Sequence, residues 1–160
     1  MSVRTDVQRA TDEDSTPDDA FVVAWVSRAI ESAGATGDKE VSVRIVSTDE
    51  IQALNRDYRD KDRPTNVLSF PVGEVAGLPD DEPAPLGDIV VCASVVRDEA
   101  AAQDKAIPDH WAHMLVHGAL HLLGHDHESE ADAEAMEALE IRILEAHGIG
   151  DPYKAAAKNC

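Results

Sequence analysis

The feature that most constrains this chain is a cluster of histidines, since six of the seven lie between residues 110 and 127. His117 and His121 are four residues apart in a strongly apolar stretch, so a helix would place both imidazoles on one face, one turn apart. Gly124 follows three residues later and can adopt the left-handed conformation that ends a helix and reverses the chain. His127 can then turn back, and we expect one helix end to gather three imidazoles.

The spacing H-x-x-x-H-x-x-G-x-x-H predicts a metal site with His117, His121 and His127 as its ligands. Three neutral imidazoles with one open position for water are typical of a catalytic metal site, whereas structural sites usually have four protein ligands. We expect one zinc ion per chain, and nickel or cobalt could occupy the same ligands.

The other histidines of the cluster are given different roles. His113 lies one turn before His117 and is expected to be a partly buried helix residue, with a supporting role beside the ligands as the alternative. His110 and His125 are expected on the surface. Asp126 could orient a ligand imidazole or cap the turn that follows the helix.

Gly118 separates this pattern from that of a metallopeptidase. The related peptidase motif has a glutamate directly after the first histidine, where it serves as the general base for peptide hydrolysis. Glycine offers no carboxylate at that position, so peptide hydrolysis is disfavoured. A metal ion held by the histidines could still polarise a phosphoryl oxygen or lower the pKa of bound water.

Strand and helix patterns alternate along the chain and predict a single α+β domain, in which a small mixed sheet of three to four strands packs with about five helices. A length of 160 residues suits one such domain. The expected helices are 20–33, 47–58, 94–103, 108–123 and one that begins near residue 129; the expected strands are 41–45, 66–70 and 88–92; and 71–87 is expected to be an exposed loop.

The ends and the net charge define the rest of the organisation. Residues 1–19 are expected to form a disordered acidic tail, 20–153 the folded domain and 154–160 a C-terminal tail. The net charge of −18 argues against broad binding of RNA, DNA or anionic membranes.

Two distant cysteines form no disulfide framework, and no apolar run is long enough for a secretion signal or a membrane span. We therefore expect a cytoplasmic protein.

The acidic charge is unevenly distributed. Its largest blocks are 71–88, with −5, and 128–147, with −6, whereas 51–70 carries +1. That stretch holds the densest group of cations in the chain, which are Arg56, Arg59, Lys61 and Arg63. A solvated turn with alternating charges is one interpretation, and a phosphate-binding turn is the other, because arginine binds a phosphate through two parallel hydrogen bonds.

Three segments together resemble the YbeY-type endoribonucleases, which are bacterial rRNA maturation factors. The segments are LNRDYRDKDRPTNVLSFP, LGDIVVC and HWAHMLVHGALHLLGHDH. The resemblance extends from about residue 41 to residue 153 and includes the closing MEALE and DPY segments. The family often has tyrosine where this chain has His125, which adds a potential competing ligand beside His127.

The resemblance implies a single-strand-specific, metal-dependent endoribonuclease that matures the 3′ end of 16S rRNA, takes part in ribosome quality control and lies in the cytoplasm. It implies a zinc site formed by His117, His121 and His127, with Arg59 as the functional arginine; Arg56, Lys61 and Arg63 are further candidates for binding the substrate. Whether water or the 2′-hydroxyl of the RNA attacks stays open.

The expected partners are single-stranded rRNA and the small ribosomal subunit, with no DNA and no membrane. The acidic net charge predicts weak affinity for free RNA and delivery by a basic ribosomal protein. Two alternatives to a nuclease remain. One is a ribosome-assembly factor that binds without cleaving and whose metal is mainly structural; the other, less favoured, is a metallopeptidase.

Overall fold

The computed structural model describes residues 2–72, 77, 82–125 and 129–153. Five helices and one four-stranded mixed sheet form within this part of the chain, as the sequence predicts for an α+β domain. In chain order the elements are β1 (Val3–Ala10), α1 (Asp19–Ser32), β2 (Lys39–Val46), α2 (Thr48–Arg59), β3 (Val67–Pro71), β4 (Ala84–Cys92), α3 (Ala93–Ala102), α4 (Ile107–Leu122) and α5 (Glu130–Glu145).

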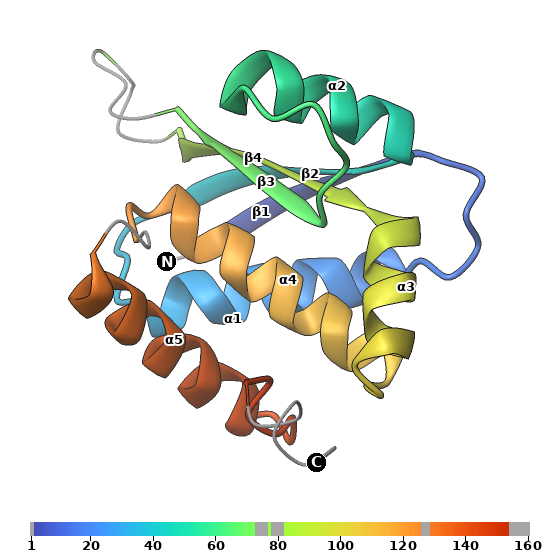
Figure 1. Ribbon diagram of the computed structural model, residues 1–160. Helices are drawn as coiled ribbons and strands as arrows, with labels where there is room; N and C mark the ends of the chain where they lie inside the picture. The colour runs from blue at the N-terminus through green and yellow to red at the C-terminus, as the bar shows by residue number, and fades with distance from the viewer. Residues whose placement is uncertain (1, 73–76, 78–81, 126–128, 154–160) are drawn as a thin grey trace.

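The sheet has the strand order β1-β2-β4-β3, and only β3 runs antiparallel to its neighbour. Helices α1 and α4 lie against one face, α5 packs outside α4, and α2 covers the opposite face (Figure 1). The larger core lies between the sheet and α1, α4 and α5, and it is almost entirely aliphatic, with Trp25 and Trp111 as its large aromatic residues. A smaller cluster under α2 includes Ile51 and Leu68.

The expectation of a disordered tail over 1–19 is wrong for its first half, because Val3–Ala10 forms β1. This strand pairs in parallel with β2 along its whole length. Val3 and Val7 pack against the main core, while the intervening Arg4 and Asp6 are exposed, so the strand alternates as a half-buried edge strand should. The segment is rich in charged residues, and its composition alone therefore suggests a disordered tail instead of a strand. The proposed tail 154–160 lies outside the described residues.

The expected loop 71–87 is too long at its C-terminal end, because β4 begins at Ala84. Pro85 and Gly87 make this part resemble a loop, yet the glycine is required by the sheet. A Cβ on Gly87 would lie 2.2 Å from the carbonyl oxygen of Phe70 on β3, and the residue has a φ of +136°. Only glycine permits so close an approach of the two strands.

The end of α4 packs closely against the sheet at Gly118. The hydroxyl of Ser69 on β3 donates a hydrogen bond of 2.9 Å to the Gly118 carbonyl oxygen. A Cβ on Gly118 would lie 2.8 Å from Cγ2 of Ile89, which is fully buried. These two contacts hold α4 against both β3 and β4.

Candidate functional site

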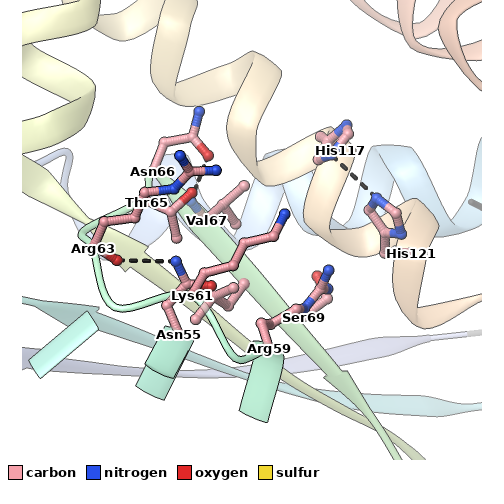
Figure 2. A pocket seen from close by; sticks show the side chains of 11 residues that line it. Asn55, Arg59, Lys61, Arg63, Thr65, Asn66, Val67, Ser69, His117 and His121 are labelled. Carbon is pink, nitrogen blue, oxygen red and sulfur yellow. Dashed lines mark hydrogen bonds between the residues drawn. The ribbon is translucent and has the colours of Figure 1, made fainter. Parts of the chain in front are cut away.

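A cavity of about 530 Å³ lies between the C-terminal end of α2, strand β3 and the last two turns of α4. It brings together five of the residues singled out by sequence, which come from segments about 60 positions apart (Figure 2). These are Arg59, Lys61 and Arg63 on one wall and His117 and His121 on the other. Arg56 is not among the lining residues, and its guanidinium pairs with Asp57 at 3.2 Å. His127, the third predicted ligand, and Asp126 lie outside the described residues.

The cationic wall is shaped by the way α2 ends. Asp60 adopts the left-handed conformation with a φ of 60°, and its backbone N–H and that of Lys61 bond back to the last turn of the helix. Asn55, which is buried, donates a hydrogen bond of 2.9 Å from Nδ2 to the carbonyl oxygen of Arg63 (Figure 2). The backbone of the turn is therefore fixed, while the side chains of Arg59, Lys61 and Arg63 are exposed.

On the opposite wall, the Nε2 atoms of His117 and His121 are 3.2 Å apart (Figure 2). That distance allows a hydrogen bond between the rings. It also fits a shared metal ion, because two imidazole nitrogens at zinc–nitrogen distances of about 2.0–2.1 Å in tetrahedral geometry lie about 3.3 Å apart. In the described part of the chain no third His, Cys, Asp or Glu joins this pair as a metal-ligand group. The spacing of the two nitrogens nevertheless fits the ion that the sequence predicts.

Glu140 on α5 fixes the orientation of His117. Its side chain is fully buried, and Oε2 lies 3.1 Å from Nδ1 of His117. Burial alone would raise the pKa of Glu140, but hydrogen bonds from His113, His117 and Tyr153 outweigh it and hold that pKa well below its usual range. An ionised carboxylate can only accept, so Nδ1 of His117 donates, and in the neutral ring the Nε2 lone pair is available to a metal.

The other oxygen of Glu140 is held by two donors. Oε1 lies 2.7 Å from Nε2 of His113 and 2.6 Å from the hydroxyl of Tyr153. Burial lowers the pKa of His113 more than its contact with Glu140 raises it, so the ring is neutral and its proton resides on Nε2. Burial, together with the bond to Glu140, also raises the pKa of Tyr153, which therefore stays protonated and donates.

Sequence analysis included Glu140 and Tyr153 only as members of the MEALE and DPY segments and gave neither residue a role. One signal could have found the first: Glu140 follows Met136 by four residues and precedes Leu144 by four, so it occupies the apolar stripe of α5. A charged residue in such a stripe must be paired, and its donors can come from the elements that α5 covers or from the segment that follows α5. Identifying the donors still requires the tertiary structure.

His113 is buried, in keeping with its prediction as a partly buried helix residue, and its contact with Glu140 gives it the supporting position considered as the alternative. The prediction for His110 is wrong, because its side chain is buried against α3 and not exposed. Its Nε2 lies 2.9 Å from Oε1 of Glu99, and the same carboxylate accepts from the amide of Asn66, which lines the cavity at the start of β3. His125 is half-buried, not fully exposed.

No helix in the described part of the chain is both long and apolar enough to cross a membrane.

Comparison with known proteins relates this chain to one family throughout. A family model described as "Endoribonuclease YbeY" matches residues 6–148. A protein of Halorhodospira halophila with that name is 59% identical over 140 residues, which cover 88% of this chain and 90% of the relative. One from Alcanivorax borkumensis, also named "Endoribonuclease YbeY", is 52% identical and covers 94% of this chain and 86% of its own length.

A solution structure of a Thermotoga maritima protein shares the fold, with a TM-score of 0.55 at 27% identity, and the match covers 91% of both chains. The region matched by the family model begins within β1 and includes every residue that lines the cavity.

Proposed function

The chain belongs to the endoribonuclease YbeY family, and on that premise we propose that it is a metal-dependent endoribonuclease that cleaves single-stranded RNA in the cavity between α2, β3 and α4. The observation that supports this most is the convergence of Arg59 with His117 and His121 around one cavity. The proposed substrate is ribosomal RNA, including the 3′ end of 16S rRNA, and the proposed setting is ribosome maturation and quality control in the cytoplasm.

In this proposal, some residues of the chain bind the metal or the RNA, and Arg59 also stabilises charge in the transition state. His117, His121 and His127 would hold a zinc ion, which when bound supplies a Lewis acid for the phosphoryl group or an activated water. Arg59 binds the scissile phosphate through two N–H groups and stabilises the additional negative charge of the transition state. Lys61 and Arg63 hold the neighbouring phosphates of the strand.

Arg56 is the weakest of the four cationic candidates in this proposal. It does not line the cavity, and its guanidinium pairs with the adjacent Asp57. Any contact it makes with RNA would therefore be with phosphates outside the cavity.

The acidic charge outside the cavity favours a basic binding partner. The net charge is −18, whereas the cavity has three cationic side chains on one wall. Free RNA would meet long-range repulsion before reaching that wall. We therefore propose that a basic ribosomal protein of the small subunit docks on acidic surface and brings the strand to the cavity.

Particular residues argue against each of the two alternatives. A metallopeptidase would need a base from another residue in place of Gly118, where a Cβ would already meet Ile89, Ser69 and Val67. A binding factor with a structural metal would not need an arginine across the cavity from the histidines, and a structural site usually has four protein ligands.

Cleavage assays with matched substrates test the proposal. The purified chain is incubated with labelled single-stranded RNA and with an unfolded protein, each with and without a chelator, and its zinc content is measured. We expect zinc in the protein, RNA cleavage that the chelator stops, and an intact polypeptide. Zinc without RNA cleavage, alone or with small subunits added, would refute the proposal in favour of a binding factor, and a cleaved polypeptide would favour a peptidase.

The ends of the RNA products identify the attacking oxygen. A 2′,3′-cyclic phosphate would assign the attack to the 2′-hydroxyl of the RNA. A linear 3′- or 5′-phosphate with no cyclic precursor would assign it to water.

A further inference from the structure

We propose that Glu140 is a positioning residue for the metal site: it holds the ring of His117 with Nε2 directed to the metal, and His113 and Tyr153 hold Glu140 in turn. This inference rests on the proposed metal site. It assigns a role to α5 and to the segment that follows it, neither of which lines the cavity.

The burial of Glu140 calls for a functional reason. Its side chain is fully buried, and in the described part of the chain its ion pairs are with His113 and His117, without any lysine or arginine. Taking a carboxylate out of water is costly, and an apolar residue of similar volume would serve packing at least as well. Met136, Ile143 and Leu144 fill the neighbouring buried positions of α5 in that ordinary way.

The two oxygens of the carboxylate have different partners. Oε1 is held by the donors from His113 and Tyr153, at 2.7 and 2.6 Å. Oε2 contacts only Nδ1 of His117, at 3.1 Å, among the hydrogen bonds of the described residues. One oxygen therefore fixes the carboxylate in place, and the other fixes the histidine.

The contact to Nδ1 settles which nitrogen of His117 can bind a metal. With Nδ1–H donating to Glu140, Nε2 is the nitrogen of His117 that can bind a metal, and it lies 3.2 Å from Nε2 of His121. A carboxylate behind a ligand imidazole both fixes the orientation of the ring and increases the basicity of the ligating nitrogen. The same bond therefore supports affinity as well as geometry.

Tyr153 connects the end of the chain to this arrangement. Its hydroxyl donates to Glu140 and also lies 3.2 Å from Nε2 of His113, and its ring packs edge-on against that imidazole with centroids 5.3 Å apart. Asp151 accepts a hydrogen bond of 2.8 Å from the backbone N–H of Tyr153, which shapes the turn that brings the ring back to α4. The segment after α5 thus supplies one of the three donors to Glu140.

A purely structural role for Glu140 is the competing explanation, since the residue also ties α5 to α4. In that case its loss would lower the thermal stability, but the folded protein would bind metal as well as before. Metal affinity and the spectrum of a bound metal therefore separate the two roles.

The test compares full-length Glu140→Gln with the wild type and with Glu134→Gln, which makes the same charge change at an exposed position of α5. Zinc affinity is measured by competition with a chelating dye, folding by circular dichroism, and ligand geometry by the visible absorption of bound Co²⁺. We expect folded Glu140→Gln to bind zinc roughly 10- to 100-fold more weakly with an altered Co²⁺ spectrum, while Glu134→Gln matches the wild type.

An unchanged zinc affinity and Co²⁺ spectrum in folded Glu140→Gln would overturn the inference. If that variant does not fold, Tyr153→Phe replaces it, since it removes one donor to the same carboxylate; a several-fold loss of zinc affinity is expected, and wild-type affinity would overturn the inference. Wild-type protein that binds zinc but cleaves no RNA would refute the proposed function and leave this inference standing. Wild-type protein that binds no zinc would overturn both.

Discussion

The two walls of the cavity are built in opposite ways. On the α4 wall, His117 is held through Glu140, a fully buried carboxylate with three hydrogen-bond donors. On the α2 wall, Arg59 and its cationic neighbours are exposed, and only the backbone beneath them is fixed, through Asn55. A metal ion requires ligands held within a few tenths of an ångström, whereas a flexible polyanion can be bound by cations that adjust to it. In the proposed function, the fixed α4 wall would hold the metal, and the adjustable α2 wall would hold the strand and stabilise charge on the scissile phosphate.

The largest expected effect comes from removing a ligand on the fixed wall. His117→Ala should lose zinc, and RNA cleavage should fall by about 10³-fold or more, because a metal ion contributes several kcal/mol to the transition state. The melting temperature should also fall, since Oε2 of Glu140 loses its donor. Metal analysis, cleavage rates and thermal melts measure the three results. If the variant cleaves RNA at the wild-type rate, the metal takes no part in the reaction.

On the α2 wall, loss of the hydrogen bond that fixes the backbone should weaken RNA binding. Asn55→Leu removes the hydrogen bond to the Arg63 carbonyl oxygen from a buried position, which should cost about 1–3 kcal/mol in the free energy of unfolding. The released turn should raise KM for RNA several-fold and leave zinc affinity unchanged. Gln52→Leu is the matched control, since it removes an exposed hydrogen bond from the same helix to Asp62 in the same turn. Equal effects of the two variants would contradict the role of Asn55.

The next prediction concerns the α4 wall and tests how closely α4 packs on the sheet. Gly118→Ala places a methyl group 2.8 Å from Cγ2 of Ile89, so the helix or the strand must shift. Overpacking of this kind costs about 1–3 kcal/mol, measured as a lower midpoint in chemical denaturation. The shift should also weaken zinc binding, because His117 precedes the substituted residue. An unchanged midpoint would mean that α4 approaches Ile89 on β4 less closely than described.

The smallest expected effect concerns the pH dependence at the start of β3. Burial raises the pKa of Glu99, but hydrogen bonds from His110 and Asn66 outweigh it and hold the pKa below its ordinary value of 4.5. The ionised group therefore stabilises the fold above pH 4.5, and this contribution is lost as the pH falls through the lower, folded-state pKa. Thermal melts of wild type and Glu99→Gln should differ most near neutral pH and converge in acid. A constant difference would contradict this assignment.

Much of the cavity could be predicted from sequence because the residues of each wall are close together along the chain, although the two walls are about 60 positions apart. The i, i+4 spacing of His117 and His121 and the cationic turn at Arg59 are local features, and local features determine which side of a helix or turn a residue occupies. The helices and central strands followed from hydrophobic periodicity for the same reason. The ligand role of His127 stays a prediction.

The features that could not be predicted from sequence are contacts between residues far apart in the chain. The burial of His110 against Glu99 and of Glu140 against His117 follows from how α3, α4 and α5 pack, which no spacing along the chain expresses. Strand β1 was missed because its pattern is interrupted by charged residues on the exposed face of an edge strand. Of these residues, His110 was expected on the surface, although the fold supplies its partner, Glu99.

A charge reversal on the exposed wall, with zinc measured in the same samples, tests most directly whether both walls serve one reaction. Arg59→Glu is compared with Arg4→Glu, which makes the same change on β1 at the opposite edge of the sheet, where Arg4 pairs loosely with Glu40 at 3.8 Å. We expect Arg59→Glu to retain full zinc content while RNA cleavage falls to background, and Arg4→Glu to resemble the wild type in both. Normal cleavage by Arg59→Glu would show that the cationic wall takes no part in the reaction.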